Sequence, residues 1–330
     1  MRSISISFLV GLLVMTNHVF SQQQVKAFQT HNQSPLIHSF GLPTNSGGRI
    51  LDRKSFWLGD YFNMVNNATS VSFLDGTLYF DGEMYRNELS VSYGLFSKLE
   101  VGLVIPIVKH STGIMDTFIS NWHDLFGLPG KARSYMPKYD LDYYLIQDQE
   151  LVFQMNESKL NVGDISFSLG TPILKRPNHD LSFRSYLKIP VGAKEDLIGS
   201  GTFDLSFQLS GTVHTIPRKK QVSIYYSGGY LHIGKGALLS DLVSTNVGFG
   251  NIGLSYNFND KWYVKSQFDF HTSFYEKSDT KQLGKSSAQY VLGFDYIIAK
   301  NTNLSFCFVE DIIVNTAPDF SLQFGLSHQF

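Results

Sequence analysis

The C-terminal stretch FSLQFGLSHQF alternates between apolar and polar residues up to the last position of the chain. A period of two predicts a β-strand with one apolar and one polar face. The stretch carries neither Pro nor a charged residue of the kind that usually protects an exposed sheet edge. It is therefore either an inner strand of a soluble β protein or a strand that closes a membrane barrel with its apolar face toward lipid.

The same alternation recurs along most of the chain. LSFRSYLKI (181–189), TFDLSFQLS (202–210) and NIGLSYNF (251–258) each place large apolar residues on one face and polar residues on the other. Most of the segments have the length that crosses a bilayer at a tilt, about 9–11 residues or slightly more. We predict twelve strands, an even number as in single-chain bacterial barrels: 55–65, 77–95, 98–109, 161–173, 180–190, 202–213, 221–233, 246–258, 261–273, 287–299, 303–310 and 319–330.

Short and long connections alternate between these strands. FNDK (258–261) and AKNTN (299–303) are short, whereas 191–201, 234–245 and 274–287 are long. Outer-membrane barrels have short periplasmic turns and long outer loops. The pattern predicts an all-β, transmembrane antiparallel β-barrel of the bacterial outer membrane, with both termini periplasmic. The last strand is then expected to pair with the first.

The N-terminus has the features of a secretory signal peptide. Arg2 precedes a short apolar run, Phe8 to Met15, and Val19-Phe20-Ser21 fits a cleavage site after Ser21. No later run approaches the roughly 18 apolar residues of a spanning helix. The expected organisation is a signal peptide (1–21), an N-terminal periplasmic segment (22–54) and a barrel (55–330).

One connection, residues 110–160, is far longer than the rest, and loops of such length are usually functional. STGIMDTFISNWHDLFGLPG has helical apolar spacing and ends at Gly and Pro, which predicts a helix in this outer loop. LDYYLIQDQELVFQM follows as a strand or small hairpin beyond the rim. The loop is either a lid or plug, a cap packed on the rim, or a helix on the outer leaflet. The candidate gate residues are Ile114, Asp116, Phe118, Trp122, His123 and Phe126.

Composition agrees with a membrane barrel and excludes nucleic acid as a partner. Aromatic residues reach 14% and charged residues only 17%, while the net charge is −1 and the mean hydropathy −0.07. Alternating strands in a bilayer need this balance of apolar and uncharged polar residues. Cys307 is the single cysteine, so no internal disulfide is possible.

The polar faces of the strands carry charged residues of both signs, which predicts an interior stabilised by ion pairs. A pore that recognises a solute through these groups is the alternative. The candidates for lining the lumen are Arg86, Glu88, Asp164, Arg184, Lys188, Asp204, Lys265, Asp269 and Asp295.

The sequence gives no support for an enzyme. His110 and Ser111 are neighbours, so their side chains diverge on a strand, and the G-x-S-x-G motif is absent. The histidines have no metal-binding spacing. We therefore expect no catalytic residue, no metal and no cofactor.

Several blocks together resemble the outer-membrane barrel family catalogued as domain of unknown function 3187. They are FGLP (40–43), DGEMYRNELSVSYGL (81–95), LEVGLVIPIV (99–108), NWHDLFGLPGKAR (121–133), LKIPVGAKEDLIGSGTFD (187–204) and APDFSLQFGLSHQF (317–330). The resemblance covers nearly the whole mature chain and implies the fold and the outer membrane. The LK-P-G-GSG block is also similar to one in barrels associated with the degradation of aromatic compounds. The family has no established substrate.

The terminal strand also resembles the signal by which barrel-assembly machinery recognises its clients, with Phe320, Leu322, Phe324, Leu326 and Phe330 as the signal residues. The expected function is a channel or passive transporter for a small solute, gated by the 111–137 loop. The alternative is a non-conducting binding or structural barrel whose outer loops contact a partner or lipopolysaccharide. Outer-membrane lipid surrounds the barrel in either case.

Overall fold

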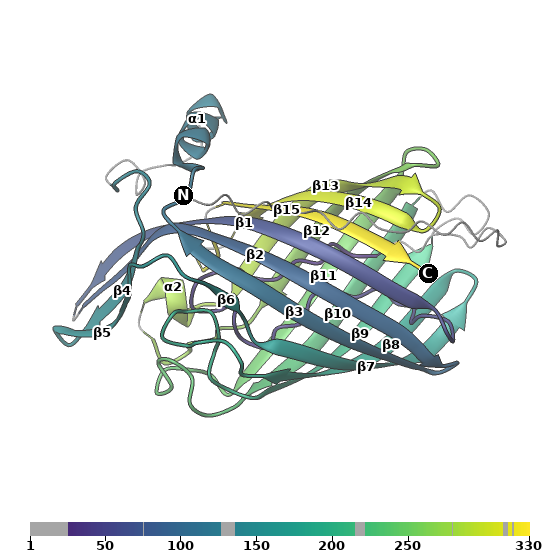
Figure 1. The fold of residues 1–330 in the computed structure, drawn as a ribbon, viewed down its shortest axis with the longest axis horizontal. Helices are drawn as coiled ribbons and strands as arrows, with labels where there is room; N and C mark the ends of the chain where they lie inside the picture. The colour runs from purple at the N-terminus through teal and green to yellow at the C-terminus, as the bar shows by residue number, and fades with distance from the viewer. Residues whose placement is uncertain are drawn as a thin grey trace, which may run out of the picture.

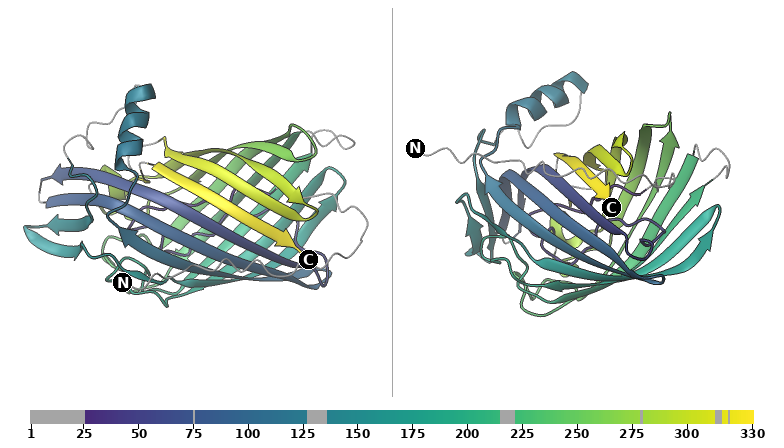
Figure 2. Two further views of the ribbon diagram at one scale, coloured as in Figure 1. Left: turned by 45° about the horizontal axis from the view of Figure 1, so that its top comes forward. Right: turned by 45° about the vertical axis from the view of Figure 1, so that its right-hand side comes forward.

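Twelve antiparallel strands form a closed barrel in the computed structural model (Figures 1 and 2), which describes residues 26–330 apart from 75, 127–135, 215–221, 279, 313–315 and 319. All twelve predicted strands are confirmed. They are β1 (Phe56–Phe73), β2 (Gly76–Phe96), β3 (Leu99–Ser111), β7 (Ile165–Arg176), β8 (His179–Ile189), β9 (Asp204–His214), β10 (Val222–Ile233), β11 (Asn246–Asn257), β12 (Trp262–His271), β13 (Ser287–Ala299), β14 (Thr302–Asp311) and β15 (Phe320–Gln329).

The first and last strands pair with each other, as predicted. The register runs from Trp57 opposite Gln329 to Asn66 opposite Phe320. The amide of Phe330 donates to the carbonyl of Phe56 at 2.8 Å, so the ladder continues to the end of the chain. Hydrocarbon offers no partner for a free backbone group, and closure therefore removes the cost of an open sheet edge.

Alternation along each strand separates an apolar outer face from a polar inner face. On β9, Leu205, Phe207 and Leu209 are exposed on the outside of the barrel, whereas Ser206 and Gln208 are buried inside it. The short turns 97–98, 177–178, 258–261 and 300–301 lie at the end where β1 begins and β15 ends. That end is periplasmic by the rule for outer-membrane barrels, and the opposite end is extracellular.

β1 is longer than predicted and continues with β2 as a hairpin past the extracellular rim. Residues 66–72 (NNATSVS) lack large apolar residues at alternate positions, so the pattern that predicts the strand stops there. β4 (Asp142–Gln147) and β5 (Glu150–Met155) extend its edge, at the left of Figure 1, which confirms the predicted hairpin beyond the rim. We call residues 66–83 together with β4 and β5 the paddle.

Three short elements complete the described secondary structure. β6 (Leu160–Val162) pairs with the upper part of β3, α1 (Asp116–Phe126) lies in the long outer loop, and α2 (Lys281–Gly284) lies in another outer loop. Neither described helix has the length and apolar character needed to cross a membrane.

Residues 26–51 lie inside the barrel and not in the periplasm, where we had expected the 22–54 segment. Their purple trace runs behind the front strands in Figure 1 and between the walls in Figure 2. Most of these residues are buried, and they bond to strands on several sides of the wall. We call residues 26–51 the lumen segment.

Two neighbouring positions on β15 test the assignment of inner and outer faces. In a Cys307→Ser background, Cys at Ser327, which lines a cavity at the periplasmic end, should react with a charged maleimide added from the periplasmic side. Cys at Leu326, which is 43% exposed on the outer face, should resist that reagent in proteoliposomes because lipid covers it. Equal labelling of both positions would contradict the assignment.

Candidate functional site

The lumen segment enters the barrel at its periplasmic end and rises along β12. The amide of Phe28 donates to Gln267 at 3.0 Å, and the hydroxyl of Thr30 donates to Asp269 at 2.5 Å. Asn32 reaches the carbonyl of Thr316 at 2.9 Å, in the connection between β14 and β15. This first leg of the segment therefore crosses the lumen from the periplasmic to the extracellular end.

The segment turns at residues 34–40, which form its apex. The amides of Ile37 and His38 both donate to the carbonyl of Ser34, at 2.9 and 3.0 Å, so the apex is a compact helical turn. His38 Nε2 donates to the carbonyl of Leu197 in an outer loop at 2.8 Å, and its Nδ1 accepts from Arg86 at 3.1 Å. A neutral histidine satisfies both bonds.

The segment then descends to the periplasmic end, where β1 begins. Gly41 donates its amide to Asp204 at 2.8 Å, Gly48 donates to Thr212 at 3.1 Å, and Leu51 donates to Glu100 at 2.8 Å. A Cβ at Gly48 would lie 2.3 Å from the carbonyl oxygen of Asp180, so the close approach of the two backbones requires glycine.

Hydrogen bonds between the two legs stabilise the segment itself. Asn45 donates to the carbonyl of Thr30 at 3.2 Å, and Thr44 donates to Gln29 at 3.1 Å. The segment is therefore a U-shaped unit that enters and leaves by the same end of the barrel.

An apolar core covers the apex at the extracellular end. Phe40 stacks on Phe274 at 5.3 Å between ring centroids, and the hydroxyl of Tyr275 donates to the carbonyl of Leu36 at 2.7 Å. The rest of this core comes from the inner face of the paddle, from the upper ends of β10 and β11 and from outer loops: Leu78, Phe80, Leu141, Tyr143, Leu145, Met155, Leu197, Leu231, Ile233, Ala237, Val247, Phe249 and Leu283, together with Ile37 of the apex.

All nine residues proposed to line the lumen are buried or nearly so in the structure, on the inner side of the wall, and most form ion pairs. Lys188 contacts both Asp164 and Asp204, at 2.8 and 2.9 Å. The remaining pairs join Arg86 to Glu88 at 2.6 Å, Arg184 to Glu100 at 3.0 Å and Lys265 to Asp295 at 2.8 Å. Asp269 instead accepts hydrogen bonds from Thr30, Asn45 and Gln267. The functional role of the nine residues proposed to line the lumen remains a prediction.

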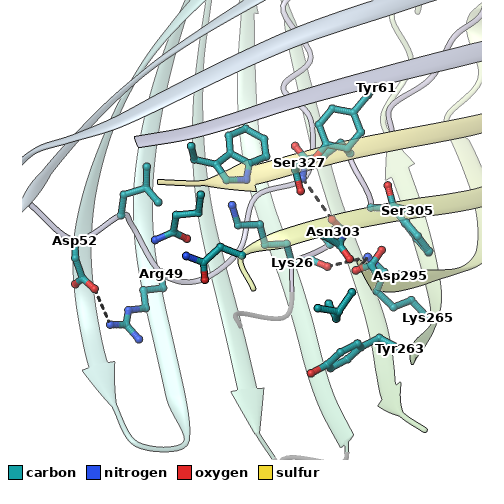
Figure 3. A pocket seen from close by; sticks show the side chains of 18 residues that line it. Lys26, Arg49, Asp52, Tyr61, Tyr263, Lys265, Asp295, Asn303, Ser305 and Ser327 are labelled. Carbon is teal, nitrogen blue, oxygen red and sulfur yellow. Dashed lines mark hydrogen bonds and ion pairs between the residues drawn. The ribbon is translucent and has the colours of Figure 1, made fainter. Parts of the chain in front are cut away.

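The space left around the lumen segment is a series of small cavities. Two of these cavities, of about 70 and 80 Å³, lie toward the periplasmic end, and the first is lined by Lys26 and Arg49 of the segment (Figure 3). Two others nearer the apex measure about 40 and 20 Å³. A cavity needs roughly 10–15 Å³ for each water molecule, so the narrower cavities hold only a few waters.

The proposed gate helix lies outside the lumen. Met115 and Ile119 pack against Phe320 of β15, whose apolar side chains point outward, and Phe118 contacts the same ring at 6.0 Å. Glu83, buried on the outer side of β2, accepts the amides of Ile114 and Met115 and so fixes the start of the helix.

Asp116 and Ile114 do not point into the lumen either. Asp116 accepts hydrogen bonds from Asn66 on the outer face of β1 and from the amide of Tyr139, while Ile114 is 71% exposed. Trp122, His123 and Phe126 belong to α1, but their side chains lie outside the described residues.

His110 and Ser111 diverge, as their adjacency predicts. His110 is buried inside the wall and donates from Nε2 to the carbonyl of Leu197 at 3.2 Å, whereas Ser111 lies on the opposite face of β3. No group of three or more His, Cys, Asp and Glu side chains within the described residues could hold a metal ion.

The comparison with protein families identifies the chain. A model for a family described as "Protein of unknown function (DUF3187)" matches residues 3–330. The chain belongs to this family. No curated protein matches the sequence.

Solved structures with a similar fold are outer-membrane barrels. The COG4313 outer membrane channel from Pseudomonas putida F1 is 12% identical, with a TM-score of 0.55 over 85% of this chain and 97% of that one. The NanC porin is 8% identical (TM-score 0.48, 82% and 98% coverage), and the Ralstonia pickettii toluene transporter TbuX is 12% identical (0.40, 93% and 95%). The first similarity shows the fold. The protein has the fold of outer-membrane β-barrels.

Sequence reasoning missed the lumen segment, Glu100 and the loop carbonyl of Leu197. Residues 26–51 have no regular period, and their partners lie up to 294 positions away. The apolar cluster LIHSF at 36–40 was the one local signal that this stretch seeks burial.

Replacing Lys188 by Met should destabilise the barrel strongly. The change leaves Asp164 and Asp204 buried without their shared cation, which costs about 3–5 kcal/mol when a buried pair loses one partner. The free energy of unfolding in urea, measured in lipid vesicles, checks this. Lys175→Met is the matched control, because Lys175 is 59% exposed in its pair with Asp52 and should contribute about 0–1 kcal/mol. Similar losses in both variants would contradict the ion-pair account.

Acidification should loosen the apex of the lumen segment. Burial, with Arg86 and then His110 as further causes, holds the pKa of His38 well below its usual value, and burial lowers the pKa of His31 to about 4. An undocked histidine binds a proton near pH 6.5, so docking loses up to about 1.4 kcal/mol for each histidine and each pH unit below that value. The groups that face His38 are Arg86, His110, His31 and the Leu197 carbonyl.

Amide hydrogen exchange at residues 34–40, corrected for the intrinsic pH dependence, measures this loosening. Exchange should rise from pH 7 to pH 5, and His38→Gln, which keeps a donor and an acceptor without titrating, should weaken the response. Corrected exchange that is independent of pH would show that the histidines do not control docking.

Proposed function

We propose that this protein is an outer-membrane channel for a small solute, and that the lumen segment controls its opening. The observation that carries the proposal is the course of the segment. It enters and leaves through the periplasmic end, so the chain is not threaded through the barrel within the residues that the structure describes. Withdrawal into the periplasm would therefore break no pairing between the twelve strands of the wall.

The contacts of the segment support a reversible interaction. No described residue of 26–51 belongs to a strand, and its bonds to the wall run mainly between single side chains and backbone groups. Each such bond contributes only about 0.5–1.5 kcal/mol net. The wall behind it is lined by Ser, Thr, Gln, Asn and paired charges, which water would solvate once the segment had moved.

The segment replaces the 111–137 loop as the controlling element in this proposal. α1 packs on the outward side of β15, and neither its described side chains nor its anchor Glu83 reach the lumen. This position fits the alternative of a helix at the outer leaflet better than a gate.

A non-conducting barrel remains the second candidate, and the apolar core over the apex favours it. Leu36, Ile37 and Phe40 are each less than 7% exposed. Burying such side chains stabilises docking by about 1.5–3 kcal/mol each, which is enough to keep the segment in place without a trigger. In that case the paddle and outer loops would serve a partner or lipopolysaccharide.

Single-channel recording with two glycine variants separates the candidates. Gly48→Val should prevent the descending leg from docking, because its Cβ would lie 2.3 Å from the carbonyl oxygen of Asp180. We expect steady conductance steps from this variant and rare or brief openings from the wild type. Gly228→Val is the matched control, since no atom lies within 4 Å of the added Cβ.

Each result has a clear meaning, provided that folding is established first by the shift of the unheated protein on electrophoresis. A folded but silent Gly48→Val variant would favour the non-conducting barrel. Steady conductance in the wild type would show that the segment does not close the lumen. Higher conductance after replacing 113–126 with a short linker would return control to the outer loop.

A further inference from the structure

The inner wall carries an excess of negative charge. Among the buried or nearly buried inward residues of the described wall, the cations are Arg86, Arg184, Lys188 and Lys265. The carboxylates are Glu88, Glu100, Asp164, Asp204, Asp269 and Asp295. Four cations against these six carboxylates give this set a formal charge of −2, and Asp311, opposite Gln289 at an inward position of β14, adds to the negative excess.

The lumen segment supplies the opposite charge. Lys26 and Arg49 are its only charged residues, and both lie at the periplasmic cavity (Figure 3). Lys26 Nζ lies 4.1 Å from the centre of the Trp57 ring, a second feature that attracts cations. Wall and segment therefore carry opposite formal charges, and Arg49 also pairs with Asp52, just beyond the segment, at 3.2 Å.

The segment also supplies N–H donors to individual carboxylates of the wall. Asp204 accepts the amide of Gly41, and Glu100 accepts the amide of Leu51. Asp269 accepts from the side chains of Thr30 and Asn45, and it forms no ion pair with any described residue. In the docked state each of these carboxylates accepts a hydrogen bond from the segment, and that bond is lost when the segment withdraws.

Withdrawal would leave two negative charges among three carboxylates without a compensating cation or donor from the segment. Asp269 would lose both of its donors from the segment, and Asp164 and Asp204 would share the single cation of Lys188. Low-dielectric walls of a narrow lumen concentrate the field of such unbalanced charges and raise the local concentration of counter-ions. Rings of carboxylates are a common basis of cation selectivity in channels.

We infer that the open lumen selects cations and takes small cationic or N–H-rich solutes, such as amines, guanidines and amides, in the positions that the segment's donors vacate. This inference rests on the proposed function. The lumen segment thus acts as an internal substitute for the solute, with its amide groups and Lys26 occupying the solute's contacts.

The reversal potential of the Gly48→Val channel in a KCl gradient tests the inference. We expect a reversal potential with the sign that K⁺ permeation produces. The K⁺ to Cl⁻ permeability ratio should be at least about three, because an acidic lumen with unbalanced charge concentrates cations. Adding Asp269→Asn should lower that ratio by roughly half, because one of the two uncompensated charges is gone. The matched control is Asp60→Asn, an exposed carboxylate on the outward face of β1, which should leave the ratio unchanged.

The outcomes separate the inference from the function it rests on. Conductance with Cl⁻ preference, or without preference, would overturn the inference and leave the channel intact. An equal fall of the ratio in Asp269→Asn and Asp60→Asn would also overturn it. A lack of conductance from folded protein would contradict both the inference and the proposed channel function. If Gly48→Val does not fold, Phe40→Ser, which weakens the apex core instead, provides the open channel.

Discussion

The backbone ladder between β1 and β15 is the constraint on which the rest of the structure depends. Lipid provides no partner for a free N–H or C=O group, so the sheet has to close on itself. Closure brings the start of β1 to the periplasmic end, next to Phe330. Residues before Phe56 consequently emerge at the mouth of the lumen, where a polar, partly charged wall offers them hydrogen bonds.

The polar inner wall and the lumen segment depend on each other. A barrel of this size has an interior that must be filled by side chains, by water or by another part of the chain. Buried carboxylates such as Asp204 and Asp269 need donors, and the segment's amides and side chains supply them. The same bonds hold a segment without regular secondary structure in one defined conformation.

The twelve strands were predictable because each carries its own two-residue period, whatever its neighbours are. The outer half of β1 was missed because residues 66–72 lack that period. The inward position of the charged residues followed from the alternation of side chains along each strand. Their partners could not be predicted in this way, because Glu100 and Arg184 lie 84 positions apart.

The lumen segment has no period, and Phe28 bonds to Gln267 across 239 positions. The outward position of α1 depends on Glu83 and Asn66, two polar residues on the outward side of the β1–β2 hairpin.

The covalent link between the lumen segment and β1 has a kinetic consequence. Residues 52–55 join Leu51 directly to the wall, so a withdrawn segment stays within a few residues of its docking site. A short tether of this kind holds the effective local concentration of a binding element in the millimolar range. Reclosure would then be an intramolecular event, independent of protein concentration in the membrane, and any open period would last only as long as the influence that displaced the segment.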